Sequence, residues 1–150
     1  MQEKASSSRR WCYGCGEDNP EGLRIAFRVD GRCAVGQFTP REVHQGYPGL
    51  AHGGVAAAAL DEAMGWAIYG AGAWAVTARM EVRYRRPLPL GQELVVSAEV
   101  TRSRGRWLEV KGEIRAPSGE LLAESKGVFL RLLQQRGKEL EAYYRADQES

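Results

Sequence analysis

The sequence HGGVAAAALDEAMGWA, residues 52–67, decides the fold. Its apolar side chains recur at the i, i+3, i+4 spacing of one helix face, which predicts a helix from about Gly53 to Tyr69. Four consecutive alanines, residues 56–59, keep the first half of this helix thin, so that other backbone can pack closely around it. We therefore expect the helix to be buried inside a sheet. Its apolar face consists of Leu60, Ala63, Met64, Ala67 and Ile68.

Strand patterns flank this helix on both sides. Before it, residues 23–29 and 33–38 alternate in polarity around Asp30-Gly31, a dipeptide that favours a tight hairpin turn. After it, alternating apolar residues separated by turns continue to about Leu132, which predicts an antiparallel meander. Together these patterns predict an α+β domain with a curved antiparallel sheet of about six strands around the helix. Because such a sheet has two uncovered edges, we expect at least a dimer paired through them.

The composition narrows the classes of protein to consider. A chain of 150 residues fits one domain, and its formal net charge of +2 gives no field that attracts nucleic acid or an anionic membrane. The longest apolar run, residues 55–60, is far shorter than the roughly 20 residues that a bilayer requires. No apolar segment follows the polar N-terminus, so we expect no signal peptide and a cytoplasmic location. We expect a flexible polar tail over residues 1–10, the domain over 11–133, and an extension over 134–150 with a frayed helix.

Two features of the helix suggest chemistry. Gly53 and Gly54 leave backbone N–H groups uncovered at the positive end of the helix dipole, which can hold a developing oxyanion. Alternatively, these glycines only allow the loop to pack tightly. Asp61 lies in the middle of a helix expected to be buried, where an unpaired carboxylate costs several kcal/mol. Asp61 is either a functional acid or half of a structural ion pair with an arginine. Its neighbour Glu62 points about 100° further round the helix, so we expect Glu62 to face solvent.

The spacing of these two features limits how they can act together. Gly53 and Asp61 are eight residues apart, which is about 12 Å along a helix. That distance is too long for both to contact the same small reacting group. If they cooperate, Asp61 of one copy serves Gly53 of another across a two-fold axis, with two sites in each dimer.

The sequence resembles a known family. Residues 52–67, followed by Thr77 and by RYRRPLPLG at residues 83–91, resemble the hotdog-fold thioesterases of the phenylacetate-pathway type. The segments CYGCGEDNPEGLRIAF (12–27) and HQGYPGLAHGG (44–54) are similar to a branch that includes mammalian acyl-CoA thioesterases. The resemblance covers residues 12 to about 132. It implies the hotdog fold and hydrolysis of acyl-CoA thioesters, with coenzyme A as part of the substrate and no further cofactor.

The resemblance also implies roles for individual residues. Asp61 is the nucleophile or the general base, and the Gly53 N–H binds the thioester carbonyl. His52 and Thr77 assist by positioning. Several relatives carry an asparagine six residues before the histidine of the HGG motif, where this chain has Gly46. In this chain, the role of that asparagine side chain is taken by His44, by Gln45 or by water, or it is missing.

Basic residues near the end of the next strand suggest contacts to coenzyme A. Arg83, Arg85 and Arg86 precede Pro87, and guanidinium groups bind phosphates well. The alternative is a solvated outer face, which is the commoner role of alternating arginines. We assign Arg85 and Arg86 to the substrate-binding set, whose other members are Tyr84, Gly54 and His44.

Cys12-x-x-Cys15 is half of a zinc site, and the sequence offers no second pair or suitably spaced histidines. We expect no bound metal and expect the thiols to be free and packed within a loop, with a zinc site assembled from two chains as the alternative.

Three alternatives to a thioesterase stay open at this point. They are a non-catalytic acyl-CoA- or lipid-binding module, a hotdog hydratase or dehydratase that uses His52 and Asp61, and a structural interaction protein.

Overall fold

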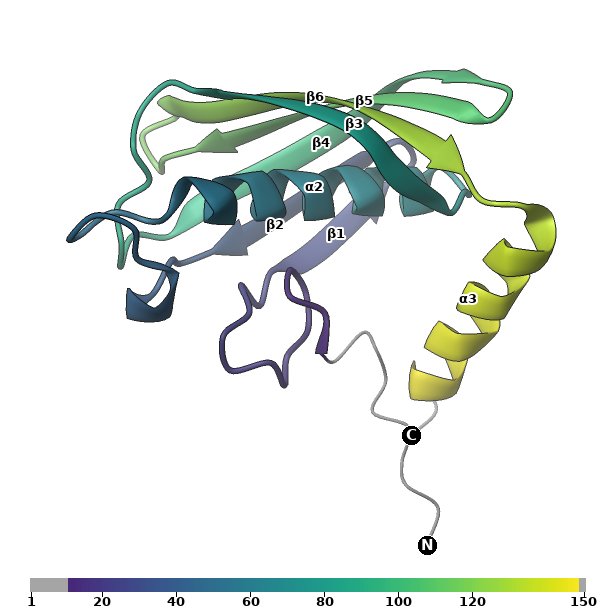
Figure 1. The fold of residues 1–150 in the computed structure, drawn as a ribbon, viewed down its shortest axis with the longest axis horizontal. Helices are drawn as coiled ribbons and strands as arrows, with labels where there is room; N and C mark the ends of the chain where they lie inside the picture. Colours follow the sequence, from purple (N-terminus) through teal and green to yellow (C-terminus); the bar gives the residue numbers. More distant parts are fainter. Residues whose placement is uncertain (1–10, 149–150) are drawn as a thin grey trace, which may run out of the picture.

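A computed structural model describes residues 11–148; the predicted tail over residues 1–10 lies outside them. One long helix, α2 (Gly53–Gly70), runs along the concave side of a curved antiparallel sheet (Figure 1). The strands are β1 (Ala26–Asp30), β2 (Cys33–Phe38), β3 (Ala75–Tyr84), β4 (Leu94–Arg104), β5 (Trp107–Arg115) and β6 (Leu121–Arg131). A short 3-10 helix, η1 (Glu42–His44), precedes α2, and α3 (Gln134–Gln148) follows the sheet. The predicted α+β hotdog architecture is confirmed.

The sheet order is β1-β2-β4-β5-β6-β3, so β1 and β3 are its two edges. The predicted hairpin forms at Asp30-Gly31, where Gly31 has φ +54°. In β3 the pairing with β6 shifts register between Thr77 and Arg79, which is a β-bulge on an edge strand. Pairing of an edge with a second copy of the chain stays a prediction.

The core lies between α2 and the sheet. All five residues of the predicted apolar face of α2 are buried, together with Val55, Ala56 and Ala59. Glycines in the sheet allow the helix to approach closely, because a Cβ on Gly127 of β6 would lie 3.0 Å from the Met64 sulfur. The alanine-rich helix and these glycines together explain how one helix fits inside the curved sheet.

Two expected boundaries differ from those observed. The first strand begins at Ala26 rather than Leu23, because Arg24 has φ +53° and interrupts the extended backbone. The Leu23 and Ile25 N–H groups donate instead to the carbonyls of Tyr13 and Gly14, at 2.8 and 2.9 Å. These bonds attach the segment that contains the Cys-x-x-Cys motif to the start of β1.

The C-terminal helix α3 begins at Gln134, the first residue of the predicted extension, and fills it as far as Gln148 rather than forming a short frayed helix within it. It leaves the sheet and extends away from it (Figure 1). The Tyr144 ring stacks on Trp74 with centroids 5.4 Å apart, which connects α3 to the segment between α2 and β3. No helix within residues 11–148 has the length and apolar character needed to cross a membrane.

Candidate active site

His52 caps the N-terminus of α2. Its Nδ1 accepts a hydrogen bond of 2.8 Å from the Gly54 N–H, so the ring proton of neutral His52 lies on Nε2. The Gly53 N–H is the first of the helix and has no intrahelical acceptor. No other acceptor for it is found among residues 11–148. Of the two glycine N–H groups expected to be uncovered, Gly54 is therefore engaged and Gly53 is available to a ligand.

A cavity of about 280 Å³ opens beside this helix start. The Tyr84 hydroxyl donates a hydrogen bond of 2.7 Å to the Gly53 carbonyl, which holds the end of β3 against α2. The cavity therefore combines the available Gly53 N–H with a phenol and with two arginines. Its lining consists of Ala51, His52, Gly53, Ala56, Tyr84, Arg85, Arg86, Pro87 and Leu88.

The three arginines near the end of β3 have different partners. Arg85 donates to Glu124 of β6 at 2.8 Å, and this hydrogen bond lowers the pKa of the Glu124 carboxyl. Arg83 pairs with Glu81 at 3.3 Å and does not line the cavity. The Arg86 side chain has no ion pair among the residues that the structure describes. Of the two arginines that line the cavity, Arg86 is therefore the one without an ion pair among the described residues.

Asp61 lies on the side of α2 that is next to β3. The Thr77 hydroxyl donates a hydrogen bond of 2.6 Å to Asp61 Oδ1. Asp61 is half-buried rather than buried, because β3 is an edge strand and covers it from one side only. Within residues 11–148 no arginine pairs with it, so the structure gives no support to the structural ion pair.

The predicted site residues thus form two groups rather than one. Gly53 and Tyr84 meet at the start of α2, and Asp61 and Thr77 meet at its middle. Both groups combine α2 with the edge strand β3. Within one chain they remain separated by about two helical turns, as their spacing in the sequence requires.

His44 is placed differently from the rest of the expected substrate-binding set. It is only 2% exposed, its Nδ1 accepts the Arg41 N–H at 2.9 Å, and its Nε2 lies 2.9 Å from the Glu21 carbonyl oxygen. Its own carbonyl accepts the His52 N–H at 2.8 Å. His44 therefore fixes the loop that leads into α2, and no ring nitrogen is left for a substrate.

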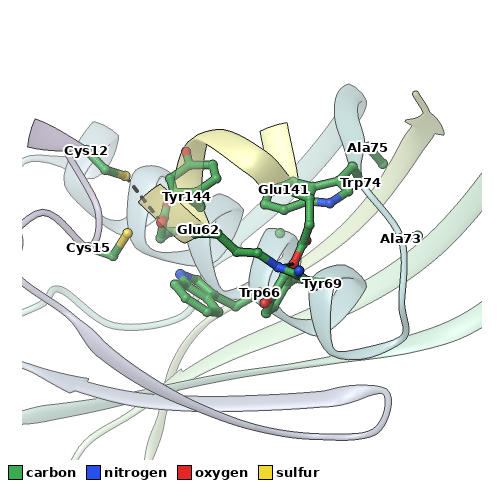
Figure 2. Close-up of a pocket in the computed structure, with 12 residues that line it drawn as sticks. Cys12, Cys15, Glu62, Trp66, Tyr69, Ala73, Trp74, Ala75, Glu141 and Tyr144 are labelled. Atoms are coloured by element: carbon green, nitrogen blue, oxygen red, sulfur yellow. Dashed lines mark hydrogen bonds and ion pairs between the residues drawn. The ribbon is translucent and has the colours of Figure 1, made fainter. Parts of the chain in front are cut away.

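Glu62 does not face solvent as expected. The N-terminal segment covers it, and the Cys12 thiol donates a hydrogen bond of 3.3 Å to its Oε1. A second cavity, of about 340 Å³, lies beside this contact (Figure 2). Sequence reasoning missed this cluster because the two residues are 50 positions apart and no periodicity connects them.

Residues 48–123, about half of the chain, match the family model described as "Thioesterase superfamily". The chain belongs to this superfamily. A thioesterase superfamily protein of known structure is 30% identical and superimposes with a TM-score of 0.69 over 73% of this chain and 57% of its own. The PaaI protein from the Escherichia coli phenylacetic acid degradation operon, 24% identical, gives a TM-score of 0.70 over 73% of this chain and 84% of its own. The resemblance to the hotdog-fold family is thereby confirmed.

Curated proteins named acyl-coenzyme A thioesterases are also similar in sequence. The acyl-coenzyme A thioesterase THEM4 of Bos taurus is 34% identical over 89 residues, which is 59% of this chain and 36% of the relative. THEM5 of Mus musculus, also named an acyl-coenzyme A thioesterase, is 29% identical over 109 residues. The matched segment is 72% of this chain and 44% of the relative. The chain thus spans less than half the length of these relatives. A hypothetical thioesterase protein of Streptococcus pneumoniae, solved with coenzyme A, is 18% identical with a TM-score of 0.68 over 71% of this chain and 87% of its own.

Proposed function

We propose that the chain hydrolyses an acyl-CoA thioester to the free acid and coenzyme A. The observation that carries this proposal is the Asp61 carboxylate, which is held by the Thr77 hydroxyl at 2.6 Å and has no cationic partner among residues 11–148. A half-buried carboxylate in this position is accessible to a substrate and has one defined orientation. The names of the curated relatives support the same activity.

Two chemical routes are open to Asp61. As a nucleophile, its carboxylate attacks the thioester carbon and expels the CoA thiolate, and water then hydrolyses the mixed anhydride. As a general base, it takes a proton from a water molecule that attacks the same carbon. In both routes negative charge develops on the carbonyl oxygen. The Gly53 N–H, at the positive end of α2, is the donor proposed to stabilise that charge.

The proposed site combines two copies of the chain. Gly53 and Asp61 of one copy are about 12 Å apart, which separates the oxyanion donor from the carboxylate. Both lie beside β3, an edge strand with exposed apolar side chains such as Val76, which is 49% exposed. Pairing of β3 with β3 of a second copy covers these side chains and brings the two α2 helices together. We therefore propose a homodimer or a homotetramer with Asp61 of one copy serving Gly53 of the other.

The cavity at the start of α2 is proposed to hold the coenzyme A portion of the substrate. Arg86 faces it without an ion pair among the described residues, and Arg85 stands next to it in its pair with Glu124. Tyr84 and His52 line the same cavity, and His44 is left out because both of its ring nitrogens are engaged. No cofactor beyond the coenzyme A of the substrate enters the proposal. The thioesterase unit is assigned to residues 11–133, with 134–150 as an extension. We place it in a reducing cytoplasm, which keeps the cysteines out of disulfides.

Thiol release from a panel of aryl- and fatty-acyl-CoA substrates tests the proposal. Asp61→Asn, which keeps the side-chain shape, is expected to lower kcat on the best substrate about 100-fold or more. Asp30→Asn, at the exposed β1–β2 turn, is the matched control and is expected to keep wild-type activity. A kcat of Asp61→Asn within about tenfold of wild type contradicts the catalytic role.

The same assay separates the alternative functions. Tight binding of acyl-CoA without any turnover indicates a binding module. Hydration of an enoyl-CoA, with the thioester left intact, indicates a hydratase that uses His52 and Asp61. Either result overturns the proposed hydrolysis.

A further inference from the structure

Three potential metal ligands meet away from the proposed active site. The Cys12 and Cys15 sulfurs and one Glu62 carboxylate oxygen all lie within 4.8 Å of one another. Figure 2 shows the two sulfur atoms on the N-terminal segment, beside the Glu62 carboxylate of α2. The cluster therefore joins a local Cys-x-x-Cys motif to a helix that begins about forty residues later in the chain.

The local backbone brings these three groups together. A turn in which the Gly16 N–H donates to the Cys12 carbonyl at 2.8 Å places both thiols on one side of the segment. Gly14 lies directly over Glu62, and a Cβ there would be 2.6 Å from the Glu62 Cδ atom. A side chain at Gly14, one of the two residues between the cysteines, would push the Glu62 carboxylate aside, so glycine here lets the carboxylate lie against the turn.

We propose that Cys12, Cys15 and Glu62 bind one zinc ion. Two thiolates and a carboxylate are ligands that zinc accepts, whereas magnesium and calcium prefer oxygen ligands alone. Zn–S and Zn–O bonds of about 2.3 and 2.1 Å in a tetrahedron place sulfur and oxygen about 3.6 Å apart. The Cys12 sulfur and Glu62 Oε1 are 3.3 Å apart, so zinc fits with small shifts of the side chains.

The charges of the cluster also favour a cation. The nearby Arg145 pairs with Glu141 at 3.5 Å rather than with this cluster. A divalent ion neutralises the carboxylate and the thiolates together.

The fourth zinc position is assigned to the adjoining cavity. That cavity, of about 340 Å³, has Glu62 and both cysteines in its wall, with Trp66, Trp74 and Tyr144 around them (Figure 2). A tetrahedral zinc with three protein ligands completes its coordination with water or with a small ligand. This site is independent of the proposed hydrolysis, because none of its ligands belongs to the proposed catalytic set.

Metal titration of the full chain, reduced and stripped with a chelator, tests the zinc site. Zinc and cobalt(II) are expected to bind at one ion per chain, and cobalt(II) to give thiolate-to-metal charge-transfer absorption. Cys12→Ser and Cys15→Ser are expected to weaken binding by at least about tenfold and to remove most of this absorption, and Glu62→Gln to weaken binding. Cys33→Ser, which alters the exposed thiol of β2, is the matched control and is expected to bind as wild type.

A second measurement guards against variants that fail to fold. Zinc is expected to raise the Tm of the wild type and of Cys33→Ser, and to raise the Tm of Cys12→Ser and Cys15→Ser by clearly less at the same zinc concentration. Circular dichroism of each metal-free variant checks that the fold persists. The proposal is overturned if the reduced wild type binds no zinc, or if the Cys12→Ser and Cys15→Ser variants bind it as tightly as the wild type.

Discussion

The Thr77 hydroxyl donates a hydrogen bond of 2.6 Å to Asp61 Oδ1. This bond connects the middle of α2 to the edge strand β3 and gives the carboxylate a defined orientation. A second contact between the same two elements, from the Tyr84 hydroxyl to the Gly53 carbonyl at 2.7 Å, lies at the start of the helix. Both halves of the proposed chemistry therefore lie along a single sheet edge, where a second copy of the chain can pair.

Thr77→Ala is expected to lower kcat about tenfold and to change KM little, because the hydroxyl orients the carboxylate without binding the substrate. Thr77→Ser keeps the hydroxyl and is expected to stay close to wild type. Steady-state thiol release gives kcat and KM separately for each variant. If Thr77→Ser is as impaired as Thr77→Ala, the hydroxyl has no positioning role and the loss comes from packing of the methyl group.

Arg86→Ala is expected to raise the KM for acyl-CoA about tenfold through loss of a charge-assisted phosphate contact. The same variant should hydrolyse the corresponding acyl-pantetheine, which has no phosphate, at the wild-type rate. Arg83→Ala serves as the control, since Arg83 lies three residues earlier, at the end of β3, but pairs with Glu81 and is outside the cavity. Equal effects of Arg86→Ala on both substrates would show that the arginine does not contact phosphate.

Two helical glycines are expected to respond oppositely to alanine. At Gly65 an added Cβ meets nothing within 4 Å, so Gly65→Ala should stabilise the chain by about 1 kcal/mol through helix propensity. At Gly70 the Cβ would collide with the Gly31 carbonyl oxygen, so Gly70→Ala should destabilise it by about 1–3 kcal/mol. Urea unfolding measures both changes. A Gly70→Ala variant as stable as the wild type would contradict the close approach of α2 to the β1–β2 turn.

The fold could be predicted from the sequence because its main signals are periodic and local. The apolar face around Leu60 and Met64 follows the helical period, and Asp30-Gly31 specifies its own turn. The start of β1 was predicted wrongly for a reason that the pattern does not contain. The alternation of Leu23 and Ile25 continues into β1, but the positive φ of Arg24 and the bonds to Tyr13 and Gly14 exclude those residues from the strand.

The sequence allowed us to predict which residues make up the candidate site, but not which contacts those residues make. The sequence and the family resemblance together pointed to Asp61 and Gly53 as candidates, and the helical rise gave the distance between them. The two residues misjudged, Glu62 and His44, are both covered by segments distant in the chain. Their burial depends on how the N-terminal segment folds back over α2 and the loop before it, and no spacing within either segment encodes that contact.

Complementation between two inactive variants tests the shared site most directly. Gly53→Pro removes the N–H proposed to bind the carbonyl, and proline is tolerated there because Gly53 is the first helical residue and His52 has ψ 141°. If Gly53 of one copy works with Asp61 of the other, a mixed dimer of Gly53→Pro and Asp61→Asn contains one intact site. When the two variants are refolded together in equal amounts, about half of the dimers are mixed, and each mixed dimer has one intact site out of two. The mixture should therefore recover about a quarter of the wild-type thiol release, although each variant alone is inactive. No recovery in a mixture shown to contain mixed dimers would contradict the shared site.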